Sequence, residues 1–196
     1  MLEFIKKRRF FICMFSLSLL SAWWGAVFLK TATNEALSTL STLLGAELKS
    51  ASANFGDYIF SSVVGDMAAL FLIYLFGFSP ISTPFICAIL IFSSFGAGLS
   101  IGYTYLSFSV AALLWVAVLM APKTALCILA ICLAAECGAE FSHSIFSCAF
   151  KNGGEKINIK KIYKYSLNFL NFSCIIIFGG VLDATLNKIF SNVITL

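Results

Sequence analysis

The sequence has 196 residues, of which 60% are apolar and only 11% are charged. A soluble globular domain carries about 25% charged residues, so too few charges are present here to cover a water-exposed surface. The apolar residues also form long blocks, whereas a soluble amphipathic helix shows a periodic stripe. These features exclude a soluble globular domain and predict an integral membrane protein.

The positive charges, which exceed the negative ones by 4, gather in two clusters that flank apolar blocks. One cluster is Lys6–Arg9, and the other consists of the lysines between Lys151 and Lys164. Such clusters are typical of the cytoplasmic ends of membrane spans and of contacts with membrane lipids. A nucleic-acid surface would combine basic and stacking aromatic side chains on a water-exposed face, but most aromatic residues here lie inside apolar blocks. We therefore expect membrane lipids, and no nucleic acid, as partners.

The first apolar block, Phe10–Leu29, follows the basic N-terminal residues 1–9. It is long enough to cross a bilayer and longer than the core of a cleaved signal peptide, which is usually about 7–15 residues. We expect an uncleaved first span whose N-terminus is cytoplasmic. Trp23 and Trp24, in its later half, are typical of an aromatic anchor at the far interface.

The segment 30–59 is polar but contains few charges, and we expect it to be extracytoplasmic. Within it, leucines recur at helical spacing from Glu35 to Leu48. This spacing predicts an amphipathic helix that packs on the membrane surface or on the bundle.

The rest of the chain contains four blocks that are long enough to cross a bilayer and one that is too short. The long blocks are Phe60–Phe78, Ile81–Leu106, Thr124–Phe146 and Leu167–Leu186. The short block, Phe108–Ala121, ends at Pro122. Because both basic clusters are expected in the cytoplasm, an even number of crossings must separate them. The short block is therefore predicted to enter and return as a re-entrant half-helix, with Pro122 at the turn back.

The sequence thus predicts an all-α fold, a polytopic membrane helix bundle of five transmembrane helices plus a short re-entrant half-helix. We expect one integral membrane domain over 1–196. Residues 1–9 and a basic loop over 151–164 are placed in the cytoplasm, and the C-terminus is placed outside it.

Small residues mark the positions where we expect helices to approach closely. Gly98 and Gly102 lie four apart on one helix face, and Gly138 belongs to a stretch rich in alanine. Small residues at this spacing let another backbone approach. Together with Pro122, these glycines are the helix-packing candidates.

Four ionisable residues inside apolar blocks are the candidates for chemistry. Asp66 lies in the second block, and Glu136, Glu140 and His143 share one face of a later block. We weigh two interpretations: satisfied structural groups that hydrogen-bond within the bundle, and a proton or ion path. Asp183 and Lys188 are expected to extend to the outer interface.

The sequence contains no arrangement typical of an enzyme. The seven cysteines form no CxxC pair, and the single histidine makes a metal site improbable. No nucleotide-binding loop or nucleophile–base arrangement occurs. We therefore expect no catalytic residues, no cofactor and no metal.

Three stretches together resemble the stage II sporulation protein M family. In Phe60–Pro80 a Leu-Phe-Gly-Phe-Ser turn precedes a proline-containing helix, and Gly98–Tyr103 looks like the family's Gly-Phe-Thr-Val-Gly-Phe stretch. In Ala121–Phe141 Pro122 opens a helix rich in small residues. Many members have Pro-His-Gly and then a glutamate at this point, where the present sequence has Lys123, Thr124 and Cys127.

The resemblance implies a non-catalytic scaffold of the bacterial cell membrane. Such a protein localises peptidoglycan-degrading partners, other membrane-anchored proteins, in the complex that drives engulfment of the forespore during sporulation. Its partner surfaces would be Lys30–Ile59 and the small-residue face that contains Gly98. The alternative is a transporter or permease-type subunit with a polar path near Asp66 and Glu136, because broken helices often line substrate sites. An intramembrane enzyme is the weakest alternative.

Overall fold

A computed structural model describes residues 9–29, 31, 55–108, 121–150 and 159–191. Within these ranges the chain forms helices without strands, and a short turn over 78–82 joins two of them. The helices are α2 (Arg9–Phe28), α4 (Phe55–Gly77), α5 (Thr83–Phe108), α7 (Ala121–Phe150) and α8 (Ile159–Ser191). All five are long and apolar enough to cross a membrane, which confirms the predicted all-α bundle with five spans.

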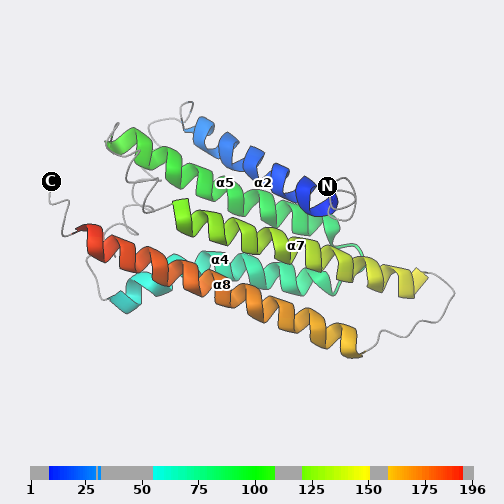
Figure 1. Cartoon of the computed structure of the whole chain (residues 1–196). Helices are drawn as coiled ribbons and strands as arrows, with labels where there is room; N and C mark the ends of the chain where they lie inside the picture. Colours follow the sequence, from blue (N-terminus) through cyan, green and yellow to red (C-terminus); the bar gives the residue numbers. More distant parts are fainter. Residues whose placement is uncertain (1–8, 30, 32–54, 109–120, 151–158, 192–196) are drawn as a thin grey trace.

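Helix α7 lies at the centre of the bundle, with α2 and α5 on one side and α4 and α8 on the other (Figure 1). It makes contact with each of the four other helices. Its small side chains allow this position, because Ala130, Ala134 and Ala135 are fully buried and let the neighbouring helices approach. The alanine-rich stretch in the sequence therefore marks the core of the fold.

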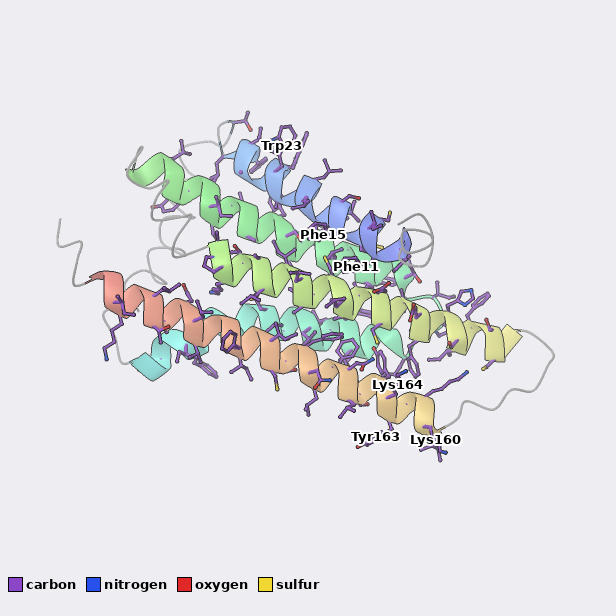
Figure 2. The ribbon with its side chains drawn as sticks, in the orientation of Figure 1. Phe11, Phe15, Trp23, Lys160, Tyr163 and Lys164 are labelled. Carbon is purple, nitrogen blue, oxygen red and sulfur yellow. The ribbon has the colours of Figure 1, made fainter. Side chains whose placement is uncertain are left out.

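The helices run alternately in opposite directions (Figure 1). Helices α2, α5 and α8 begin at one end, which we call the basic end because Lys160 and Lys164 lie there (Figure 2). Helices α4 and α7 begin at the other end, the far end. The end of α7 returns to the end where α2 begins, as the charge argument predicts. Helix α5 finishes at the end where α7 begins, and the predicted half-helix between them lies outside the described residues.

The first two turns of α8 lie within the range 151–164, where the sequence predicts a basic loop. The structure is helical from Ile159 onward, eight residues before the predicted start of the last span. Helix α8 has 33 residues and is about 50 Å long, whereas the hydrocarbon core is about 30 Å thick. The lysines in its first turns are exposed, so the helix continues beyond the apolar layer while their charges stay in water.

Helices α2 and α5 form the closest pair in the bundle, and glycines make this possible. A Cβ atom at Gly98 would overlap the backbone carbonyl of Ala22 on α2, and one at Gly25 would overlap the carbonyl of Phe95 on α5. A Cβ atom at Gly102 would lie 2.8 Å from Leu29 Cδ1. The predicted packing face is therefore covered by α2 of the same chain, which occupies the surface that the sequence suggests for a partner protein.

The two other packing candidates lie on α7. A Cβ atom at Gly138 would lie 3.3 Å from Ile73 Cγ2 on α4 and 3.2 Å from Ile86 Cδ1 on α5, so three helices meet at this glycine. Pro122 is the second residue of α7. Proline is tolerated in the first turn of a helix, because the backbone donor that it lacks has no partner there.

An aromatic cluster joins α4, α7 and α8 at the basic end. Its members are Tyr74, Phe78, Phe141, Tyr165 and Phe169. Tyr165 is its centre: its ring stacks on Phe141 with centroids 4.3 Å apart, and its hydroxyl donates to the Tyr74 carbonyl at 3.0 Å. Gly77 leaves the space that this hydroxyl occupies, because a Cβ atom there would overlap it.

Candidate functional site

A polar network lies among α4, α7 and α8 toward the far end of the bundle. Lys123 Nζ lies 3.5 Å from Asp183 Oδ2, and Ser62 Oγ donates to the same oxygen at 3.5 Å. The Cys127 thiol lies within hydrogen-bonding reach of the Asp66 carboxylate and within electrostatic range of Lys123 and Asp183. We call these five residues the polar network.

Helical spacing explains why these side chains meet. Ser62 and Asp66 are four residues apart on α4, and Lys123 and Cys127 are four apart on α7, so each pair shares one helix face. Two glycines of α8 let that helix approach both faces. A Cβ atom at Gly180 would overlap Val63, and one at Gly179 would lie 3.7 Å from Cys127 Sγ. Asp183 follows one turn later and completes the network.

The ion pair explains how a charge remains inside the bundle. Asp183 is only 5% exposed, and an unpaired carboxylate so deep in an apolar environment would be costly. The ammonium group of Lys123 and the hydroxyl of Ser62 offset this cost. The prediction that Asp183 extends to the outer interface is therefore wrong, since its side chain points into the bundle. Lys188, in the last turn of α8, is exposed as expected.

The structure separates the predicted polar candidates instead of joining them. Asp66 is half-buried and belongs to the polar network. Glu136 is half-buried farther along α7, and Glu140 and His143 are exposed on the same helix. Within the described residues, no three His, Cys, Asp or Glu side chains are grouped in a way that could hold a metal ion.

The distance along α7 separates Glu136 from Asp66. Asp66 lies beside Cys127, within hydrogen-bonding reach. Glu136 lies nine residues beyond Cys127, which corresponds to about 13 Å of helix. The interior side of α7 between these positions is apolar and at most 1% exposed, with Ala130, Ile131, Cys132, Ala134 and Ala135. A close-packed layer therefore lies between the two carboxylates.

Ser62, Lys123 and Cys127 are members of the network that the sequence analysis does not predict, and Lys123 is the most informative of them. A usable signal is present: Lys123 directly precedes one apolar block and Asp183 lies near the end of another, and the predicted topology places the start of the first block and the end of the second at the same end. Opposite charges that share a depth in the membrane are expected to pair.

The side chains at the outer surface fit a membrane environment. Trp23 is 62% exposed on the outer side of α2, toward the far end, while Lys160, Tyr163 and Lys164 extend from the start of α8 at the basic end (Figure 2). Amphipathic aromatic and lysine side chains anchor helices at the two interfaces. This arrangement agrees with five helices that span a bilayer.

Comparisons of the sequence and structure with protein-family models, with curated proteins and with solved structures gave no match.

Proposed function

We propose that the chain is a non-catalytic membrane scaffold, a compact bundle that holds partner proteins at the membrane. The observation that carries this proposal is the close-packed apolar layer between the polar network and Glu136. A transport path would need polar groups or water across this layer, and α7 presents fully buried alanines there. Within the network, Lys123 forms an ion pair with Asp183, and Cys127 lies within hydrogen-bonding reach of Asp66. These contacts connect α7 to α8 and to α4.

The partners that we propose are membrane-anchored peptidoglycan hydrolases of a sporulation engulfment complex. This part rests on the resemblance of three stretches to the stage II sporulation protein M family. The positions at which many members have a histidine and a glutamate are Lys123 and Cys127 here, and both belong to the polar network. In this chain both residues contact neighbouring helices, which suits a structural role. Because α2 covers Gly98 and Gly102, the proposed partner surface is the segment 30–59.

Co-purification of the tagged full-length chain from sporulating cells of its host tests this proposal. Peptidoglycan hydrolases should be recovered with the wild-type chain. A variant in which residues 32–54 are replaced by a Gly/Ser linker of equal length should insert in the membrane but lose them. Consistent absence of hydrolases from the wild-type sample would contradict the scaffold, and their retention by the linker variant would contradict the proposed surface.

A transporter subunit is the second candidate, and one observation favours it: the polar network places two carboxylates, an ammonium group and a thiol inside predicted spans. Ion or proton flux into proteoliposomes that contain the purified chain would support transport, if Asp66→Asn abolished it. Flux that is equal to that of protein-free liposomes would argue for the scaffold.

A further inference from the structure

A stripe of exposed apolar and aromatic side chains runs along α8 on the side away from the bundle. Its members recur at spacings of three, four or eight residues and are each at least 45% exposed: Ile159, Tyr163, Leu167, Leu170 and Phe178. Such spacing places them on one face of the helix. The opposite face carries side chains that are buried in the core: Tyr165, Phe169 and Ile176. In a bilayer the stripe from Leu167 onward therefore faces the acyl chains of lipids.

Two lysines lie beside the first turns of this stripe. Lys160 precedes Phe178 by 18 residues, which is five full turns, so both lie on the same side of α8. Lys164 follows Lys160 by one turn, and both side chains are exposed. Figure 2 shows Lys160 and Tyr163 extending from α8 on the side away from the other helices. Two ammonium groups and a phenolic hydroxyl therefore border the end of the apolar stripe.

We propose that Lys160 and Lys164 bind the phosphate of one anionic phospholipid, whose acyl chains lie along Leu167 and Leu170. The depth of the lysines fits this ligand. Leu167 begins the predicted span, and along the helix axis Lys164 lies about 5 Å and Lys160 about 10 Å farther from the membrane centre. The headgroup region is about 5–8 Å thick on each side of the hydrocarbon. Flexible lysine side chains at these levels reach a phosphate in that region, whether the chain is a scaffold or a transporter subunit.

The charge at this end of the bundle favours an anionic lipid over a zwitterionic one. Lys161 adds a third exposed ammonium group within the first two turns of α8, and Glu140 on α7 is the exposed carboxylate of the described residues at this end. A lysine binds phosphate as a point charge. A basic side chain near an anionic membrane surface strengthens binding about fivefold. The headgroup of phosphatidylcholine carries its own positive charge, so the lysines gain less from it.

Native mass spectrometry of the full-length chain in detergent tests the proposal. The chain is mixed with equal amounts of phosphatidylglycerol and phosphatidylcholine that have identical acyl chains, and the bound lipids are counted. The first lipid bound should be phosphatidylglycerol, and excess inorganic phosphate should not displace it. Equal binding of the two lipids would overturn the proposal. Displacement by inorganic phosphate would show that a free anion suffices and would overturn the assignment to a lipid.

Variants at the two ends of α8 locate the binding. Lys164→Gln should lower the affinity for phosphatidylglycerol about fivefold, and Lys160→Gln combined with Lys164→Gln about 25-fold. The matched control is Lys188→Gln, which removes one charge from an exposed position at the other end of the same helix and should leave the affinity near that of the wild type. Because these side chains are exposed, the thermal unfolding midpoints should change little. Equal losses in Lys164→Gln and Lys188→Gln would show attraction to net charge alone and would overturn the site.

Discussion

The two ends of the bundle are held together by different physical means. At the far end, an ammonium group, two carboxylates, a hydroxyl and a thiol join α4, α7 and α8. At the basic end the same three helices are joined by stacked rings around Tyr165. The first arrangement depends on charge pairing, so the loss of stability is large when one partner is removed. The second spreads its energy over many ring contacts, so the loss of any one polar atom costs less.

The comparison also bears on function. Catalytic and transport sites keep groups that are ready to react or to release a bound ion, and they lie in cavities. At the far end the ammonium group of Lys123 pairs with the Asp183 carboxylate. At the basic end the Tyr165 hydroxyl donates to the Tyr74 carbonyl, and the Tyr74 and Ser166 hydroxyls lie 3.1 Å apart. Both ends are therefore suited to holding three helices in a fixed arrangement, as a scaffold requires.

The largest effect is expected from removing the ammonium group at the far end. Lys123→Met should lower the free energy of unfolding by about 3 kcal/mol, because it leaves the Asp183 carboxylate buried without its ionic partner. The measurement is the unfolding of the detergent-solubilised chain by heat or by increasing denaturant.

A double variant serves as the control for this effect. Lys123→Met combined with Asp183→Asn removes both charges and should recover part of the loss, so the two changes should not be additive. Additive losses would show that the ammonium and the carboxylate do not stabilise each other.

Much of this fold follows from the sequence, while the polar network does not. Block length and the two basic clusters are enough to predict the five spans and the alternating directions of the helices. The length of a span depends on hydrocarbon thickness, and its direction depends on the distribution of positive charge. The network depends on side-chain rotation, which block length does not determine. The place of Asp183 near the end of a span predicts a position at the interface. Instead, Gly179 and Gly180 let α8 approach α7 and α4 closely, and the Asp183 side chain is buried in the bundle.

The partner of each packing glycine could not be predicted either. The spacing of Gly98 and Gly102 predicts that a backbone approaches, and small residues occur for this reason whether the neighbour belongs to the same chain or to another. Here the neighbour is Ala22 and Ala26 of α2. Only the arrangement of the five helices distinguishes an internal seam from a partner surface.

The seam between α2 and α5 contains no member of the polar network or of the aromatic cluster, and Gly98 tests whether it is independent of them. Gly98→Val places side-chain atoms against the Ala22 backbone, so it should destabilise the chain by about 2 kcal/mol through overpacking. Gly96→Val is the matched control, because a Cβ atom there meets nothing within 4 Å. Thermal unfolding of both variants measures the difference, and equal midpoints would contradict the close contact of α2 with α5.

The smallest effect is expected at the basic end, from a single hydroxyl group. Tyr165→Phe keeps the stacked ring but removes the donor to the Tyr74 carbonyl, so it should cost about 1 kcal/mol. Tyr163→Phe is the control, since that ring is 69% exposed two residues earlier on the same helix. If Tyr165→Phe destabilised the chain as strongly as Lys123→Met, the basic end would also depend on one polar contact, and the contrast between the ends would fail. A loss confined to about 1 kcal/mol, with no change in Tyr163→Phe, would show that ring packing carries most of the stability there.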